Sequence, residues 1–320
     1  MDRLRVAVVG AGQFGRQHLR VIRNSPQAAL VGVLDADSSR AAAAAQEYGC
    51  PALPSLESVA EAAQAAVVAT PTVTHAEIGC ALLEAGLDVL VEKPIAATLE
   101  DARRLVDTAA RRNRILQVGH LERFNPAVTA LESALTTPLF FEIHRLSPFT
   151  PRSLDVDVIL DLMIHDIDIV LTLTGAMPKE IRAAGISILT PKVDIANVRL
   201  EFPHGAVANL TASRVSTERV RKLRLFQPHE YVSLDYARQE AFVLSVTPDR
   251  QIASRHLEVA RGEPLRLELE SFFHCVRTRQ GPRVDGLAAC RALEVALNIV
   301  ATIEEHAQLV ARTLASGRRG

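Results

Sequence analysis

The chain has 320 residues, of which 48% are hydrophobic, and a formal net charge of −1. A single hydrophobic core rarely grows past about 250–300 residues, so this length predicts two domains. The small net charge gives no reason to expect nucleic acid or a membrane surface as a partner. The four cysteines form no C-x-x-C pair, which favours thiols in a reducing compartment over a disulfide framework or a zinc site.

Targeting and membrane segments are not expected. No apolar run comes near the about 20 residues that span a bilayer. The N-terminus enters an expected strand within a few residues and has no signal-peptide pattern. We therefore expect a soluble cytoplasmic protein.

A glycine-rich turn follows the first apolar run of the chain. The run 6–9 suits a parallel strand covered on both faces. It is followed by Gly10, Gly12 and Gly15 in G-x-G-x-x-G spacing. Such glycines permit a tight turn, let a pyrophosphate approach the backbone and let the next helix pack closely, and the helix N-terminus favours the phosphate charge. The pattern predicts a dinucleotide site; a glycine turn that binds no nucleotide is the alternative.

Asp35 ends a second apolar run and lies 20 residues after Gly15. An acid at this place accepts hydrogen bonds from the adenosine ribose. Its charge also repels a 2′-phosphate. The sequence therefore favours NAD over NADP as the cofactor.

The first 120 residues alternate between expected strands and expected helices. Short alternating units predict a doubly wound parallel sheet, a Rossmann arrangement, with right-handed crossovers. Ligands bind beyond the carboxyl ends of the strands in such sheets, so polar residues at these ends are expected beside the glycine turn. The residues expected to bind the cofactor are Gly10, Gly12, Gln13, Phe14, Gly15, Asp35, Thr70, Pro71, His75, Glu92 and Lys93.

Lys93 follows the expected strand over 87–91 and precedes Pro94, which restrains its backbone. A lysine at this place can hydrogen-bond a substrate hydroxyl and stabilise an alkoxide-like oxygen. A surface lysine at a strand end is the alternative. The sequence leaves open whether the bond between Lys93 and Pro94 is cis.

The alternation stops after residue 121, so we expect one domain over 1–121 and another over 122–320. In the second, strand patterns follow one another over 180–246 with short turns, which predicts an α+β domain with a mostly antiparallel open sheet. A large free sheet face usually needs a partner, so we expect a homodimer or homotetramer formed sheet to sheet. The polar stretch 247–264 is expected to be a loop or lid.

A buried helix is expected over 158–171, because this stretch is apolar almost all round. Asp161, His165 and Asp168 have the spacing that places them on one stripe of a helix. A carboxylate one turn from a histidine can orient the ring and make it a better general base. A satisfied core network is one alternative; a metal site is less favoured, because no third strong ligand is evident nearby.

These motifs together resemble the Gfo/Idh/MocA family of sugar oxidoreductases. The matching residues are the glycine turn 10–15, the sequence Glu92-Lys93-Pro94, and Asp161 four residues before His165. The resemblance implies oxidation of a ring hydroxyl of a sugar or cyclitol, with a nicotinamide as the hydride acceptor. It also implies that Lys93 and His165 are the catalytic pair, with Asp161 beside them.

The stretches 118–126 and 161–168 are similar, more narrowly, to the UDP-N-acetylglucosamine 3-dehydrogenases. In bacteria these enzymes supply a 3-keto sugar nucleotide for lipid A assembly. The arginines of the second domain fit a diphosphate-bearing substrate. Other readings stay open: another sugar or cyclitol, a non-catalytic sensor, a different reductase with the same first domain, and a glycosidase that uses NAD transiently. The residues expected to bind substrate are Lys93, His120, Arg123, Asn125, Arg145, Arg152, Asp161, His165 and Arg214.

Overall fold

The computed structural model describes residues 2–150 and 156–317. It divides into two compact units: a first unit, Met1–Phe124 with Gly262–Cys290, and a second unit, Asn125–Arg261 with Arg291–Gly320. The expected boundary near residue 121 differs from this division, because residues 262–290 return to the first unit. They return because a helix in this segment buries Leu269, Phe272 and Phe273 in the core of the first unit.

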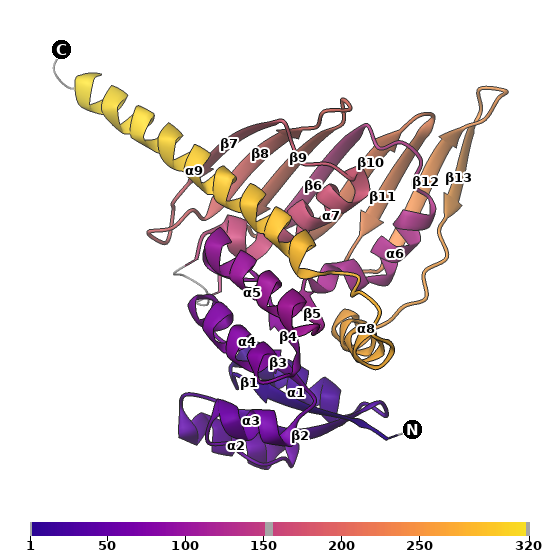
Figure 1. Ribbon diagram of the computed structural model, residues 1–320. Coiled ribbons are helices and arrows are strands. Elements are labelled where there is room, and N and C mark those ends of the chain that lie inside the picture. Colours follow the sequence, from indigo (N-terminus) through magenta and orange to yellow (C-terminus); the bar gives the residue numbers. More distant parts are fainter. Residues whose placement is uncertain (1, 151–155, 318–320) are drawn as a thin grey trace. The chain divides into compact units, whose positions relative to one another are not determined.

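Five described strands form the sheet of the first unit, in the order β2-β1-β3-β4-β5, and all of them are parallel (Figure 1). This confirms the predicted Rossmann sheet. The strands are β1 Leu4–Val9, β2 Ala28–Leu34, β3 Ala65–Val68, β4 Asp88–Glu92 and β5 Leu116–Gly119. The helices are α1 Gln13–Arg23, α2 Ser38–Tyr48, α3 Leu56–Ala62, α4 His75–Glu84, α5 Leu99–Arg112 and α8 Pro264–Thr278, with short 3₁₀ turns η1 Thr72–Thr74 and η2 Leu121–Phe124.

The helix starts of the first unit follow from local capping. The carboxylate of Asp37 accepts hydrogen bonds from two N–H groups at the start of α2, and the hydroxyl of Thr98 accepts one at the start of α5. Ser55 caps α3 in a reciprocal pair with Ser58. Helix α3 was not predicted, because serine stands where Glu or Gln marks a capping box.

Eight described strands form the sheet of the second unit, in the order β13-β12-β11-β10-β6-β9-β8-β7. Only the β6–β9 pairing among them is parallel, so the sheet is mostly antiparallel, as predicted. The strands are β6 Phe140–Leu146, β7 Glu180–Ile186, β8 Ile195–Glu201, β9 Val207–Ser213, β10 Val220–Gln227, β11 Glu230–Asp235, β12 Glu240–Val246 and β13 Ile252–His256. The helices are α6 Pro126–Ser133, α7 Ile164–Thr174 and α9 Gly286–Gly317.

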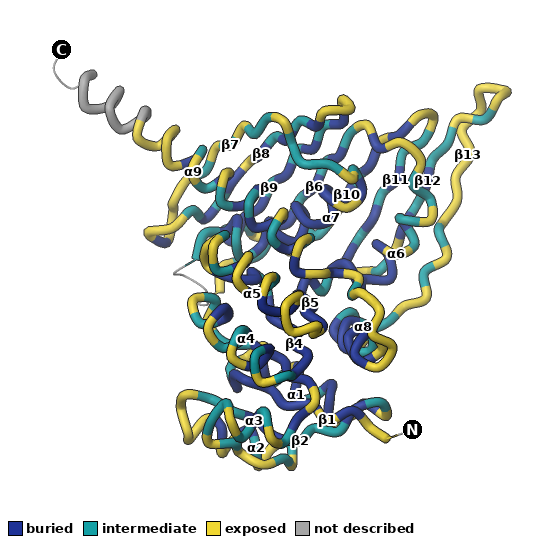
Figure 2. The backbone as a smooth tube through the Cα atoms, viewed as in Figure 1, coloured by how far each residue is buried: buried dark blue, intermediate teal, exposed yellow. Residues whose placement is uncertain are grey.

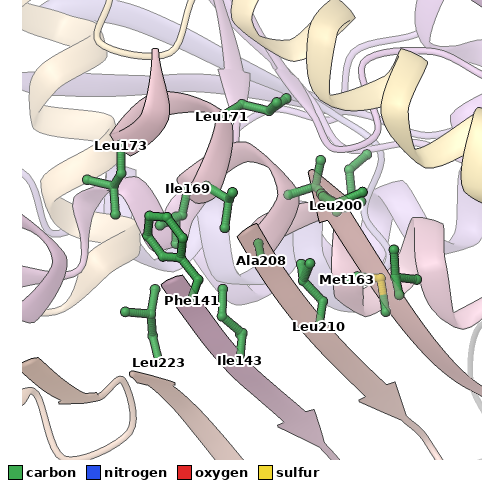
Figure 3. Packing of buried hydrophobic residues seen from close by; sticks show 14 of the residues in the cluster. Phe141, Ile143, Met163, Ile169, Leu171, Leu173, Leu200, Ala208, Leu210 and Leu223 are labelled. Atoms are coloured by element: carbon green, nitrogen blue, oxygen red, sulfur yellow. The ribbon is translucent and has the colours of Figure 1, made fainter. Parts of the chain in front are cut away.

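Helices α7 and α9 lie on one face of this sheet (Figure 1). Figure 3 shows the core between sheet and helix, where Phe141 and Leu210 from the strands lie near Ile169 of α7. Along each central strand, buried residues alternate with more exposed ones, as Figure 2 shows for β8 and β9. The alternation means that the opposite sheet face is not covered by these helices.

Two parts of the second unit differ from the sequence analysis. The stretch expected to be a loop or lid contains β13, an edge strand that pairs with β12. All five of its residues are exposed, so it lacks the apolar alternation that marks a strand. The helix expected over 158–171 contains a π-helical turn, Ile159–Met163, before it continues as α7.

Helix α9 contains a long apolar segment. Its segment 286–308 would suffice, by length and composition alone, to cross a membrane. Nearly half of that segment is buried, and Val295, Ile299 and Ile303 belong to the core of the second unit. Burial of this kind is typical of a core helix, so α9 is weak evidence for a membrane span.

Candidate active site

The glycine turn between β1 and α1 has the shape that a pyrophosphate requires. A Cβ on Gly10, whose φ is +100°, would lie 2.4 Å from the Ala69 carbonyl oxygen, and one on Gly15 would lie 1.8 Å from that of Gly10. A Cβ on Gly12, by contrast, would meet no described heavy atom within 4 Å. No described side chain caps the start of α1 at Gly12. The turn thus presents open backbone and helix N–H groups, which fits a bound phosphate.

Asp35 stands where the sequence analysis placed it, just beyond β2. Its carboxylate accepts hydrogen bonds from the N–H of Ala11 at 2.7 Å and of Asp37 at 2.9 Å. These bonds tie the acid to the glycine turn and fix it beside the expected ribose position. Arg40 lies 3.4 Å away, a neighbour that the sequence analysis did not consider.

His75 supports the rim formed by the loops after β3 and β4. Its Nδ1 lies 2.9 Å from the carbonyl oxygen of Pro94, and its Nε2 lies 2.9 Å from that of Thr70. Burial lowers the pKa of His75, and a neutral ring donates to only one of the two oxygens. The buried His75 ring therefore bridges the two loops. Its expected contact with the cofactor stays a prediction.

Lys93 follows β4, and its bond to Pro94 is cis. The carboxylate of the preceding residue, Glu92, accepts a hydrogen bond from the Lys93 N–H at 3.2 Å. Its other oxygen lies 2.7 Å from Nε2 of the buried His18. A Cβ on Gly119 would lie 2.7 Å from Glu92 Oε2, so glycine on β5 makes room for this carboxylate.

These contacts make Glu92 an anchor of the lysine backbone, and its expected contact with the cofactor stays a prediction. No role was predicted for His18. The available signal was a histidine three residues beyond the last glycine of the turn, on a helix face that packs against the sheet.

His120 and Arg123, expected to bind substrate, follow the end of β5 and are both buried. Asn125 has a different setting. Its side-chain oxygen accepts a hydrogen bond from the Ala127 N–H, which starts α6, and its amide nitrogen donates to the Tyr236 carbonyl. These two bonds give Asn125 a structural role, and its contact with substrate stays a prediction.

His165 lies in the first turn of α7 and is 7% exposed, while Asp161 lies in the π-helical turn before it and is half-buried. A π turn has i→i+5 hydrogen bonds and is wider than an α-helical turn. The stripe of Asp161, His165 and Asp168 predicted from α-helical spacing stays a prediction. Across residues 2–150 and 156–317, no group of three or more His, Cys, Asp or Glu side chains is placed to hold a metal ion.

Two of the expected anion-binding arginines have acidic partners in the second unit. Arg145 forms a buried two-point ion pair with Asp166, at 2.7 and 2.8 Å, and its guanidinium lies 5.1 Å from the ring centre of Tyr236. Arg214 lies 3.6 Å from the buried Asp194 and donates to the Val156 carbonyl. Arg152 lies outside the described residues.

Asp194 organises the loop that precedes it. Burial acts to raise its pKa, but hydrogen bonds from the N–H groups of Ile188, Leu189 and Thr190 and from the Thr190 hydroxyl outweigh burial and lower the pKa to about 2. Its negative charge explains why Arg214 is held there.

Known protein families match both units. A model described as "Oxidoreductase family, NAD-binding Rossmann fold" matches residues 4–120, and one described as "GFO/IDH/MocA C-terminal domain" matches residues 128–227. The chain belongs to the Gfo/Idh/MocA family. It is therefore an NAD-binding oxidoreductase, and its first unit is the NAD-binding Rossmann domain.

Several members of the Gfo/Idh/MocA family are similar over nearly the full length. The UDP-N-acetylglucosamine 3-dehydrogenase of Acidithiobacillus ferrooxidans is 36% identical over 314 residues, covering 96% of this chain and 100% of the relative. Its solved structure matches with a TM-score of 0.90 over 95% of this chain and 99% of that chain. The scyllo-inositol 2-dehydrogenase (NAD(+)) of Bacillus subtilis is 27% identical, covering 92% of each chain.

Proposed function

We propose that this protein oxidises a ring hydroxyl of a sugar nucleotide, with NAD as the hydride acceptor, and that the substrate is UDP-N-acetylglucosamine, oxidised to its 3-keto form. The observation that carries the proposal is the 36% identity to a UDP-N-acetylglucosamine 3-dehydrogenase across both units. The glycine turn and Asp35 support the cofactor part, because their geometry fits a dinucleotide.

NAD, when bound, supplies the group that accepts the hydride from the substrate carbon. We propose that His165 removes the proton of the reacting hydroxyl and that the ammonium of Lys93 hydrogen-bonds the same oxygen. A cation there favours the negative charge that develops as the proton leaves. Asp161 is proposed to orient His165 and stabilise its protonated ring. The anchoring of the Lys93 backbone by Glu92 supports the lysine role, because a catalytic group needs a fixed position.

The diphosphate of the substrate needs cationic partners. We propose that the arginines predicted to bind substrate, Arg123, Arg145, Arg152 and Arg214, meet the charge of the phosphates, with His120 beside them. The cytoplasm is the proposed compartment, and lipid A assembly the proposed pathway, both on the strength of the resemblance to the UDP-N-acetylglucosamine 3-dehydrogenases.

Formation of NADH against a panel of substrates tests this function. The panel contains UDP-N-acetylglucosamine, other UDP-sugars, scyllo-inositol and myo-inositol. We expect the highest kcat/KM with UDP-N-acetylglucosamine and a keto product at carbon 3. Because a relative acts on scyllo-inositol, a higher kcat/KM with an inositol would assign the protein to cyclitol oxidation instead. If none of the substrates in the panel yields NADH, the proposal as a whole is contradicted.

A further inference from the structure

The first unit buries a second acid besides Glu92. Glu268, on α8, is 0% exposed, and Glu92 is 6% exposed. Neither carboxyl oxygen of Glu268 has a hydrogen-bond partner among the residues that the structure describes. A fully buried carboxyl group without partners is costly if it carries a charge.

Other polar atoms around these two acids are also unsatisfied. Gln117, on β5, donates from its amide nitrogen to the backbone carbonyl of Glu268 at 3.1 Å, which places its side chain beside α8. Within the described part of the chain, its amide oxygen and Nδ1 of His18 lack hydrogen-bond partners. Gln117 is two residues from Gly119, which faces the Glu92 carboxylate. The acids thus belong to one buried polar cluster, built from α1, β4, β5 and α8.

The two acids differ in the hydrogen-bond donors that surround them. Glu92 accepts a hydrogen bond from the Lys93 N–H and contacts the His18 ring. Glu268 has no such donor among the described residues. Burial, and then the charge of Glu92, raise the pKa of Glu268 well above its ordinary value of 4.5. The donors beside Glu92 and the absence of described donors beside Glu268 therefore favour the proton on Glu268.

We propose that Glu268 holds a proton at neutral pH, and that this proton lets Glu92 stay charged and anchor Lys93. Glu268 is then a positioning residue that acts on the lysine through Glu92. The role of Lys93 rests on the proposed function, whereas the proton on Glu268 does not.

Other charged or titratable side chains lie on the elements packed against α8. They are His18 and Arg20 of α1, and Glu122 and Arg123 of η2. Arg20 pairs with Glu263 at the start of α8 and is largely exposed. A measurement of protonation must therefore isolate Glu268 by substitution, because a pH titration of the wild-type protein reports on all these groups together.

Thermal unfolding as a function of pH tests the proton directly, without substrate or catalysis. In E268Q, an amide replaces the protonated acid with nearly the same shape and a hydrogen-bond donor. Above pH 4.5 the unfolded glutamate ionises while the folded one keeps its proton, so the wild type loses stability as pH rises toward the raised pKa, and E268Q does not. The difference in Tm, E268Q minus wild type, is therefore expected to grow as pH rises from 5 toward the raised pKa of Glu268.

E270Q is the matched control, because Glu270 lies on the same helix but pairs with Arg266 at the surface. Its Tm difference from wild type is expected to show no such rise with pH. A Tm difference for E268Q that stays flat or falls with pH would overturn the proposal, because it would mean that Glu268 is ionised in the folded protein or titrates normally.

The positioning role is tested by turnover. As pH rises through the raised pKa of Glu268, kcat of the wild type is expected to fall relative to that of E268Q, whose amide cannot ionise. A ratio of the two kcat values that stays constant over the pH range in which the Tm difference stops growing would overturn the positioning role. If no substrate yields NADH, the proposed function fails, and the stability measurement still decides whether Glu268 holds a proton.

Discussion

Gly12 and Gly15 differ in what an added methyl group would meet, although both belong to the same turn. At Gly15 the new Cβ would collide with the backbone of Gly10, whereas at Gly12 it would enter open space. The φ of Gly12 is −68°, which any residue can adopt. A side chain at Gly15 therefore disturbs folding, whereas a side chain at Gly12 is expected to disturb only cofactor binding.

We predict that G12A folds with the Tm of the wild type but binds NAD roughly ten-fold more weakly, a cost of about 1.4 kcal/mol. G15A is expected to lower Tm as well, because backbone atoms cannot move aside cheaply. Differential scanning fluorimetry with and without NAD, and calorimetric titration of NAD, measure both effects. Unchanged NAD affinity in G12A would contradict the assignment of this turn to the phosphates.

The residues predicted from sequence are those whose signal is local. The glycine turn, Asp35 and Lys93 each stand within a few residues of a recognisable strand end. The contact between His18 and Glu92 could not be predicted, because the two residues lie far apart in sequence and meet only through packing. The same holds for the pairing of Arg145 with Asp166, which has no local signal.

At the scale of elements, the ion pair between Arg145 and Asp166 joins β6 to α7. Both side chains are buried, so removal of one partner leaves an uncompensated charge. We predict that R145M lowers the free energy of unfolding by about 3–5 kcal/mol. The double variant R145M/D166N is expected to recover part of that loss, because it removes both charges. Urea unfolding monitored by circular dichroism measures the change.

R224M is the matched control for this prediction. Arg224 lies on β10, next to β6, and pairs with Glu142 at the partly exposed surface. Loss of such a pair costs about 0–1 kcal/mol. Equal losses of unfolding free energy in R145M and R224M would contradict the prediction, because burial would then add nothing to the contribution of the Arg145 pair.

Most helices and strands could be predicted, because periodicity reports which face of an element is buried. The π-helical turn at Ile159–Met163 could not, because its sequence is apolar throughout and gives no register. That turn matters for the site, since it sets the position of Asp161 relative to His165. Strand β13 was missed because pairing with β12, not burial, makes it a strand.

At the scale of the whole molecule, the face of the second sheet away from α7 carries aromatic side chains. Phe226 is 39% exposed, and its ring centre lies 5.7 Å from that of Phe140 and 5.1 Å from that of Tyr231. The strand registers put these three rings on the same face. Exposed clusters of this kind often mark an interface between proteins.

We predict that the protein forms a homodimer or homotetramer through this face. Light scattering is then expected to give a multiple of the chain mass, 34.7 kDa, and F226E is expected to shift the mass toward that of one chain. L287E places the same charge at an exposed leucine of α9 and is expected to leave the assembly intact. A wild-type mass of 34.7 kDa at micromolar concentration would contradict the prediction.

Only part of the two-unit organisation could be predicted from the sequence. The change from alternating strands and helices to consecutive strands marked the end of the first part of the chain. The return of residues 262–290 to the first unit had no local signal, because α8 looks like any amphipathic helix. Yet this return supplies Glu268 to the polar cluster around Glu92.

The central claim is that Lys93 and His165 act on one hydroxyl group of one substrate. A double-mutant cycle tests it: kcat/KM for UDP-N-acetylglucosamine is measured in wild type, K93M, H165N and the double variant, with NAD binding checked in each. We expect each single change to lower kcat/KM about 10²–10⁴-fold, and the double change to cost little more than the worse single one. Losses that multiply in the double variant, or near-normal turnover in either single one, would contradict the claim.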